Sequence, residues 1–334
     1  MKVSVCIPTY NQSAYIEKAI RSVVNQSFRP FEVIVSDDRS TDSTIDVLEQ
    51  LEKEIPYLKI IRQPVNLGVA LNTDTCLRAA SGDYIVRLDS DDFLLPDYVE
   101  TLCDLMNKFP NAGYAHSAVK EIDANDNFTR ERKLLRTTGF LNADLALKAS
   151  LKGYKVAANI VLFRKSALES VNYISANVNF VEDFYLSVKI AEKGYGNVYF
   201  SGILCCYRVW TDAGKVRVKR KKDDILGITK VFNDVIFPAY QKRAWNINRV
   251  KRAKEKFAKT QAKCLGWDIY SNNEKNELKE LILNLSGSNK TRFFVWLYQS
   301  GNGKIVDFFS NIGQFIKLKA KKIILSSVSG RGRL

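Results

Sequence analysis

The stretch GDYIVRLDSDD, residues 82–92, joins an apolar run to a cluster of acids. Its apolar part, residues 84–88, predicts a buried strand, and three carboxylates follow directly: Asp89, Asp91 and Asp92. In open α/β sheets ligands bind beyond the carboxyl ends of strands, and closely spaced carboxylates suit Mg²⁺ or Mn²⁺. An acidic turn that bonds its own backbone is an alternative that these residues alone leave open.

Three further apolar runs, residues 3–7, 31–35 and 58–61, also read as short buried strands. Apolar residues at helical spacing fill the intervals between them, as in residues 16–24 and 45–51. This alternation of strand and helix predicts an α/β fold: a Rossmann-like, doubly wound, mostly parallel sheet flanked by helices.

Five segments, in this order and spacing, resemble the family 2 glycosyltransferases: VSVCIPTYN (3–11), FEVIVSDDRSTDST (31–44), NLG (66–68), GDYIVRLDSDD (82–92) and VEDFYLSVKIAEKG (181–194). The resemblance covers roughly residues 1–210. It implies the GT-A fold and the transfer of a sugar, with inversion, from a nucleoside diphosphate sugar to a hydroxyl acceptor.

The resemblance implies that the nucleotide rests on the lip after the first strand, formed by Pro8, Thr9, Tyr10 and Asn11. Asp38 is expected to accept a hydrogen bond from the base. The N3–H of uracil is the most natural donor, which favours a UDP-sugar, although thymine presents the same group. Asp38 is also a good turn residue, and that alternative stays open.

The turn that carries Asn66 and Gly68 is expected to complete the nucleotide site. Asp91 would hold the Mn²⁺ or Mg²⁺ ion that bridges the two donor phosphates, and Asp89 would reach the ribose or the metal. Such an ion neutralises the charge that grows on the departing diphosphate.

An inverting displacement also needs a base to accept the proton of the attacking hydroxyl. The resemblance assigns this role to Asp183, supported by Glu182, which precedes it directly. The alternative is that both acids only favour the positive N-terminus of the helix predicted after them.

Two positions depart from the family pattern. Thr73 stands where many relatives have an arginine near the nucleotide, and Arg87, inside the apolar run, is a candidate replacement. A buried arginine needs an acid or a phosphate, so pairing with Asp38 or Asp89 is the purely structural alternative. Trp210 takes the place of a histidine that often follows the last motif, so a third protein ligand to the metal is doubtful and Trp210 is a weak acceptor-site candidate.

Charge divides the chain unevenly. Residues 215–334 hold 27 Lys and Arg against 9 Asp and Glu, whereas the remainder is slightly acidic. We therefore predict a nucleotide-sugar-binding half (1–106), an acceptor-binding half (107–214) and a basic helical region (215–334). Residues 293–297 form an apolar patch, and a second apolar stretch from residue 308 runs into a lysine-rich segment that ends near 325. Such a surface fits an anionic membrane; a helical cap on the enzyme core fits equally well.

No stretch of this sequence is long and apolar enough for a membrane span, and no signal peptide precedes the first strand. These features predict an enzyme that is cytoplasmic or peripherally bound on the inner face of the membrane. The family resemblance, together with the basic region, implies an acceptor that is a glycan or a lipid-linked glycan of a cell-surface polysaccharide. The basic charge comes without a nucleic-acid-binding motif, so no nucleic acid partner is expected. Two alternatives remain: a sugar nucleotidyltransferase, and a non-catalytic membrane- or polyanion-binding protein on a degenerate transferase scaffold.

Overall fold

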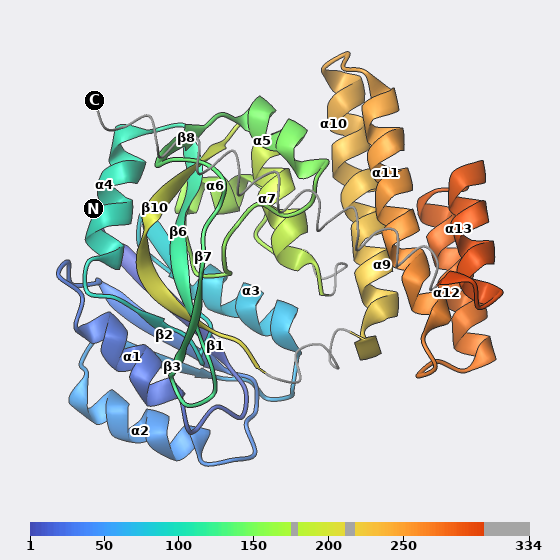
Figure 1. Ribbon diagram of the computed structural model, residues 1–334. Helices are drawn as coiled ribbons and strands as arrows, with labels where there is room; N and C mark the ends of the chain where they lie inside the picture. The colour runs from blue at the N-terminus through green and yellow to red at the C-terminus, as the bar shows by residue number, and fades with distance from the viewer. Residues whose placement is uncertain (175–179, 211–217, 304–334) are drawn as a thin grey trace, which may run out of the picture. The chain divides into compact units, whose positions relative to one another are not determined.

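The structure is a computed structural model that describes residues 1–174, 180–210 and 218–303 (Figure 1). Contacts divide the chain into two compact units, Met1–Val250 and Lys251–Leu334. The first unit is built around one mixed sheet, and the described part of the second consists of helices.

The sheet of the first unit has the strand order β3-β2-β1-β4-β9-β6-β10-β5, with β7 paired to β6 and β8 paired to β10. Its described strands are β1 (Val3–Thr9), β2 (Glu32–Asp37), β3 (Leu58–Arg62), β4 (Tyr84–Arg87), β5 (Phe93–Leu94), β6 (Ala112–Ile122), β7 (Phe128–Arg132), β8 (Gly139–Leu141), β9 (Val161–Arg164) and β10 (Gly196–Arg208). The strands from β3 to β4 run parallel, as predicted for the nucleotide half. Beyond β4 the sheet is mixed, because β9 is antiparallel to both β4 and β6.

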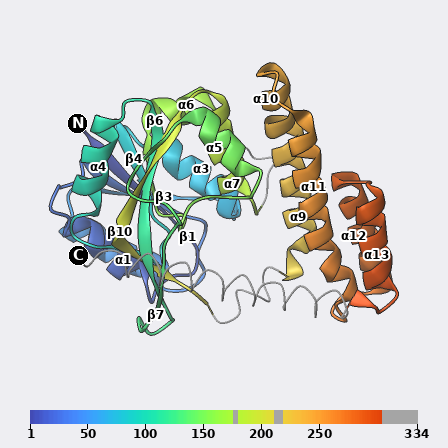
Figure 2. The same ribbon diagram turned by 45° about the horizontal axis from the view of Figure 1, so that its top comes forward.

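Helices cover both faces of this sheet. They are α1 (Ile16–Val24), α2 (Thr44–Glu54), α3 (Val69–Ala79), α4 (Tyr98–Lys108), α5 (Ala143–Ser150), α6 (Lys165–Ser170) and α7 (Glu182–Glu192). Val3, Val5 and Ile7 of β1 pack with α1, α2 and α4, whereas Cys6 packs with α3, α6 and α7 on the other face. Figure 2 shows the strands passing between α4 and the pair α3 and α7. The α/β fold predicted from the sequence is confirmed.

The first unit extends beyond residue 214, where the sequence placed the start of the basic region. It includes α9 (Lys221–Lys230), the π-helical segment η1 (Val231–Ile236) and α10 (Phe237–Lys242). Ile225, Val231 and Ile236 are buried, and both α9 and η1 pack against α7. The functional division at residues 106 and 214 stays a prediction.

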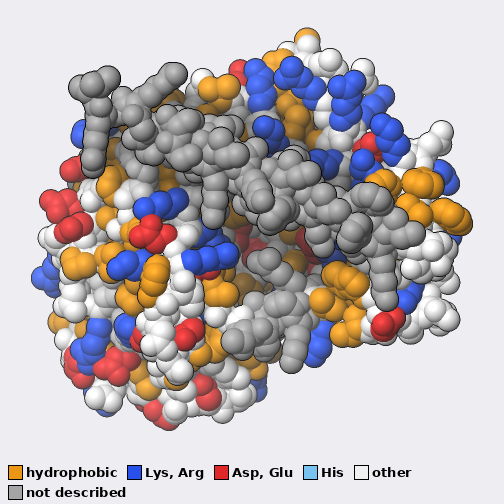
Figure 3. Space-filling view, viewed as in Figure 1, with side chains coloured by type: hydrophobic (Ala, Val, Ile, Leu, Met, Phe, Trp, Pro, Cys, Tyr) orange, Lys and Arg blue, Asp and Glu red, His pale blue; other side chains and the backbone are white. Residues whose placement is uncertain are grey.

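The second unit is helical where it is described. The helix α11 (Ile247–Gln261) leads into it, followed by the 3-10 segment η2 (Ala262–Gly266), α12 (Asn272–Leu285) and α13 (Asn289–Gln299). Figure 3 shows Lys and Arg side chains gathered over α11 and hydrophobic side chains over α13, where Phe293 and Trp296 are more than half exposed. Among the described helices, none has the length and apolarity to cross a bilayer. The apolar and basic segment 308–325 lies outside the described residues.

A buried carboxylate at the start of β2 ties three strands together. Glu32 accepts hydrogen bonds from the Ser4 hydroxyl (2.7 Å), the Ser81 backbone N–H (2.8 Å) and hydroxyl (2.7 Å), and the Lys59 ammonium (2.6 Å). Burial alone would raise the pKa of Glu32, but these hydrogen bonds outweigh burial and lower it to about 2. The stabilisation is therefore complete above the ordinary glutamate pKa and is lost as the pH falls towards 2.

We expect E32Q to lower the free energy of unfolding by about 2 kcal/mol at pH 7, because the amide keeps the shape but loses the charge that the donors stabilise. Urea unfolding at several pH values measures this, and the gap between wild type and variant should narrow between pH 5 and pH 2. E49Q is the control, since Glu49 forms an exposed pair with Arg62 and should matter by less than about 0.5 kcal/mol. An equal loss in both variants would contradict the prediction.

Candidate functional site

The carboxyl ends of β1, β2 and β4 meet at one edge of the sheet. Thr9 lies opposite Asp37 in the β1–β2 register, and Arg87 ends β4 beside Cys6 of β1. Two cavities open at this edge. The smaller has a volume of about 280 Å³ and is lined by Pro8, Thr9, Tyr10, Gln12, Asp38, Val69, Asn72, Arg87, Asp89, Ser90 and Asp91. The structure thus brings most of the predicted nucleotide and metal residues into one cavity.

Asp38 shapes this smaller cavity by holding the turn before α3. Its carboxylate accepts hydrogen bonds from the backbone N–H groups of Leu67 (2.7 Å) and Gly68 (2.9 Å), and the Asn66 amide donates to its carbonyl (3.1 Å). Gly68 adopts a φ of +82°, which glycine accepts without strain. Asp38 therefore does stabilise a turn, as the structural alternative from the sequence proposed. Each carboxylate oxygen can accept a second hydrogen bond, so contact with a base stays a prediction.

Asn11 and Asn66 do not line the cavity themselves. The Asn11 side chain accepts from the Thr41 backbone N–H at 2.8 Å and fixes the loop after β1 to the loop after β2. Asn72, the residue before Thr73, is buried in the lining. Its side chain accepts a hydrogen bond from the Ser36 hydroxyl (2.7 Å) and donates one to the Ser36 carbonyl (2.8 Å). Thr9 adds a buried hydroxyl for which the described residues supply no hydrogen-bond partner.

The three acids that follow β4 have different surroundings. Asp92 is buried away from both cavities and accepts the backbone N–H of Arg208 at 2.7 Å. Asp89 and Asp91 both line the smaller cavity. Burial and the charge of Asp89 raise the pKa of the Asp91 carboxyl above its ordinary value, a penalty that a bound cation would relieve.

Asp89 and Asp91 fit a divalent cation as a pair of hard oxygen ligands. No cluster of three or more possible protein ligands occurs among residues 1–174, 180–210 and 218–303. This suits Mg²⁺ and Mn²⁺, which usually take few carboxylates and complete their shell with water and substrate phosphates. The Trp210 indole N–H donates to Asp91 at 2.7 Å, so Trp210 orients this carboxylate.

Arg208 was not singled out in the sequence, yet it holds the acid loop in place. Its buried guanidinium donates to the backbone carbonyls of Asp91 (2.9 Å) and Asp123 (2.6 Å) and to the carboxylate of Asp126 (2.6 Å). It also lies 4.3 Å from the ring centre of Tyr15. Arg208 is the last residue of β10, as Arg87 is the last residue of β4.

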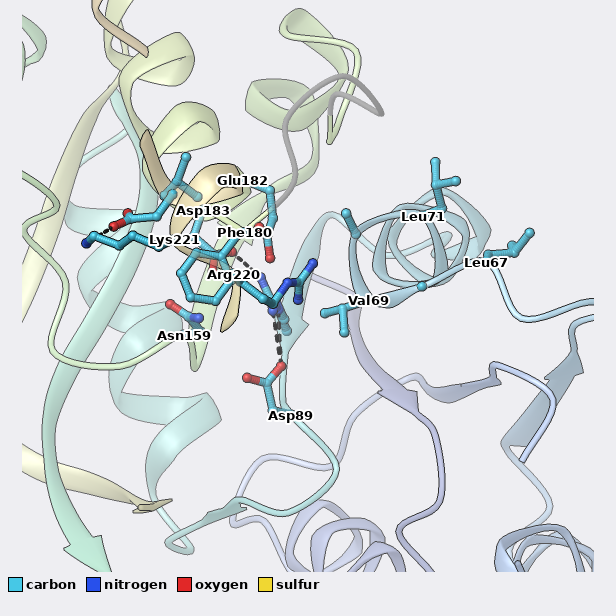
Figure 4. A pocket seen from close by; sticks show the side chains of 15 residues that line it. Leu67, Val69, Leu71, Asp89, Asn159, Phe180, Glu182, Asp183, Arg220 and Lys221 are labelled. Carbon is cyan, nitrogen blue, oxygen red and sulfur yellow. Dashed lines mark hydrogen bonds and ion pairs between the residues drawn. The ribbon is translucent and has the colours of Figure 1, made fainter. Parts of the chain in front are cut away.

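The larger cavity has a volume of about 700 Å³ and adjoins the acids of α7. Its lining comprises Leu67, Gly68, Val69, Ala70, Leu71, Arg87, Asp89, Asn159, Phe180, Val181, Glu182, Asp183, Arg220, Lys221 and Asp224. Figure 4 shows Asp89 and Glu182 entering it from opposite sides, with Leu67, Val69 and Leu71 on the α3 side. Several residues of this lining had not been predicted as site residues, among them Asn159, Phe180, Arg220 and Lys221.

Arg87 joins the two predicted halves of the site. Its guanidinium contacts the Asp183 carboxylate and lies 3.2 Å from the Asp89 carboxylate. Pairing with Asp89 was one structural alternative from the sequence; pairing with Asp183 was not foreseen. Burial raises the pKa of the Asp183 carboxyl above its ordinary range, and the Arg87 guanidinium opposes that rise. One Oε of Glu182 is buried without a hydrogen-bond partner in the described part of the chain.

The only histidine, His116, lies in neither cavity. It is fully buried in β6 with its ring 5.0 Å from that of Tyr199, and burial lowers its pKa to about 3. It is a neutral packing residue.

Comparison with known proteins decides the family. Residues 4–171, half of the chain, match the profile of "Glycosyl transferase family 2". The chain belongs to this family.

Two curated relatives support the assignment. The family 2 chain is 34% identical over 188 residues to the GalNAc(5)-diNAcBac-PP-undecaprenol beta-1,3-glucosyltransferase of Campylobacter jejuni. The aligned region covers 55% of this chain and 56% of that protein. The chain is 30% identical over 192 residues to chondroitin synthase of Escherichia coli, covering 58% of this chain and 27% of that protein. The chain thus spans between a quarter and a little over half of these relatives.

Solved structures confirm the GT-A fold of this family 2 chain. S. aureus TarS 1-349 superposes with a TM-score of 0.63 at 16% identity, covering 91% of this chain and 88% of TarS 1-349; the same protein has been solved with UDP-GlcNAc. A mannosyltransferase from Pyrobaculum calidifontis, solved with GDP-Man and Mn2+, gives a TM-score of 0.55 at 19% identity, covering 90% and 85%.

Proposed function

We propose that this family 2 glycosyltransferase moves a sugar from a nucleoside diphosphate sugar, with UDP favoured, to a hydroxyl of a glycan or lipid-linked acceptor in cell-surface polysaccharide synthesis. The observation that carries the proposal is the pair of adjoining cavities. The smaller is lined by Pro8, Thr9 and Tyr10 together with the acid pair Asp89 and Asp91, and the larger is lined by Asp183.

The nucleotide would lie in the smaller cavity. Thr9 offers a buried hydroxyl to which the described part of the chain supplies no hydrogen-bond partner, and Tyr10 is 45% exposed and available to cover a base. Asp38 would accept the base N–H while it holds the turn at Gly68. Asp91, with Asp89, would hold a Mn²⁺ or Mg²⁺ ion, which when bound neutralises charge on the departing diphosphate.

The acceptor would enter the larger cavity. Its hydroxyl oxygen forms a bond to the anomeric carbon while the bond from that carbon to the diphosphate oxygen breaks. The diphosphate leaves with the bonding electrons, the hydroxyl proton passes to the Asp183 carboxylate, and the anomeric carbon inverts. Glu182, partly unsatisfied in the same lining, is placed to support binding of a polar group.

The acceptor class draws support from the relatives. The Campylobacter jejuni protein is named for a lipid-linked (PP-undecaprenol) substrate, and a Bacillus subtilis relative is named as a putative teichuronic acid biosynthesis glycosyltransferase. The lysine-rich helix α11 and the exposed aromatic residues Phe293 and Trp296 on α13 favour binding to an anionic membrane surface, where such acceptors lie. We accordingly place the enzyme at the cytoplasmic face.

Release of UDP tests the proposed reaction. The full chain is incubated with Mn²⁺ and a panel of UDP-hexoses and UDP-N-acetylhexosamines, with and without a lipid-linked glycan fraction, and UDP is quantified. The proposal predicts release from one donor class, increased by acceptor. Release of pyrophosphate from UTP and a sugar 1-phosphate would instead identify a nucleotidyltransferase, and no turnover of any donor would favour a non-catalytic scaffold.

A further inference from the structure

Arg87 occupies the junction of the two cavities. Among the residues that the structure describes, Val69, Arg87 and Asp89 are the ones that line both cavities. Arg87 is the last residue of β4 and is paired in register with Cys6 of β1 on one side and Val161 of β9 on the other. The backbone that carries it is therefore fixed by strands on both sides, and its side chain is only 4% exposed.

The guanidinium of Arg87 is divided between acids from distant parts of the chain. Its Nη1 donates to Asp183 at the start of α7, and its Nε lies 3.3 Å from the Asp89 carboxylate in the loop after β4. A guanidinium has five N–H donors in a rigid plane, so one side chain can hold two carboxylates at a fixed separation. An ammonium on a flexible stem lacks this geometry.

We propose that Arg87 is a positioning residue that serves both cavities: it fixes the Asp183 carboxylate at the junction and, on its Asp89 side, presents positive charge to the phosphates of the donor. The inference rests on the proposed function, because Asp183 needs a fixed position only if it accepts the proton of the acceptor. Arg87 thereby sets the distance between the departing diphosphate and the base.

Loss of Arg87 should act on both kinetic constants. R87M is expected to raise the KM for the donor and to lower kcat by about 10²-fold, since a displacement of about 1 Å in a reacting group costs that much. R87K keeps the charge and should bring the donor KM back to within about threefold of wild type. Its kcat should stay low, because lysine cannot hold the two carboxylates at one separation.

A double-mutant cycle separates positioning from a general structural effect. If Arg87 acts on kcat through Asp183, then R87M/D183N should have the kcat of D183N within about threefold, whereas independent effects multiply. R164M is the matched control: Arg164 of β9 lies one strand away, and its guanidinium donates to the carbonyls of Ala112 and Met106. This variant removes an arginine of the same sheet and should change neither the donor KM nor kcat beyond its effect on the folded fraction.

Multiplicative losses in R87M and D183N, or full recovery of kcat by R87K, would overturn the proposal. Urea unfolding of wild type, R87M, D183N and R87M/D183N measures the coupling free energy between Arg87 and Asp183 without any substrate. The contact between the two residues can therefore be tested even if no donor is turned over. Absence of turnover in wild type refutes the proposed function. Turnover in wild type, with losses of kcat in R87M and D183N that multiply in the double variant, refutes only the role of Arg87. R87M leaves the buried Asp183 carboxylate without its partner, which can destabilise the fold. The double variant removes both charges, so its free energy of unfolding shows whether a loss of activity in R87M comes from unfolding.

Discussion

Replacing Asp183 by asparagine is expected to lower the rate of sugar transfer by about 10²–10⁴-fold while nucleotide binding stays within about twofold of wild type. The amide keeps the shape of the carboxylate at the start of α7 but cannot accept the proton of the acceptor hydroxyl. Asp183 lines the larger cavity and is absent from the lining of the smaller one, so the donor should bind as before. Initial rates of UDP release and calorimetric titration with UDP measure the two quantities.

The matched control for this variant is E192Q. Glu192 lies at the last turn of the same helix, α7, and its carboxylate is 3.7 Å from the Lys242 ammonium. Its loss should leave the transfer rate unchanged within about twofold, because Glu192 lines neither cavity. If D183N kept the wild-type rate, or if both variants lost activity equally, Asp183 would not be the base.

Replacing Asp91 by asparagine is expected to remove the effect of Mn²⁺ on nucleotide binding. One of the two carboxylates proposed to hold the ion would lose its charge, and the Trp210 indole would still fix the position of the side chain. Changes in groups that only orient metal ligands cost about 10–100-fold in metal affinity, so loss of a ligand should cost at least that much. Binding of UDP without metal should change little.

Calorimetric titration of UDP with and without Mn²⁺ measures this effect in D91N, in wild type and in the control D104N. Asp104 lies exposed on α4 and lines neither cavity. An unchanged Mn²⁺ dependence in D91N would remove Asp91 from the metal site. A loss in D104N of similar size would point to a general effect of net charge.

The sequence predicts the nucleotide half of the fold well because its strands are continuous apolar runs. The run at residues 3–7 becomes β1, and that at 84–88 becomes β4 with the acids directly beyond it. The acceptor half is less visible. The strand β6 continues as far as Ile122, because the buried Glu121 is paired with Arg130 and Arg132 of β7. A strand stabilised by such cross-strand ion pairs has no apolar signal of its own.

The sequence predicted two separate clusters of site residues, the acids after β4 and the acids at the start of α7. It did not predict the contact that connects them. Motif positions place Asp89 and Asp91 after one strand and Asp183 at the start of one helix. That Arg87 contacts Asp183 depends on how β4 and α7 pack, which residue spacing within either element does not encode. The link from Trp210 to Asp91 was hidden for the same reason, and Arg220 and Lys221 enter the cavity only because α9 packs on α7.

Binding of nucleotides tests the central claim most directly. UDP, dTDP, GDP, CMP and ADP are titrated in turn into the full chain by calorimetry, with and without Mn²⁺. A donor site at the carboxyl edge of β1, β2 and β4 predicts selective binding of one diphosphate, UDP first, strengthened by Mn²⁺. Failure of all five to bind under both conditions would contradict the claim that this edge of the sheet is a donor site.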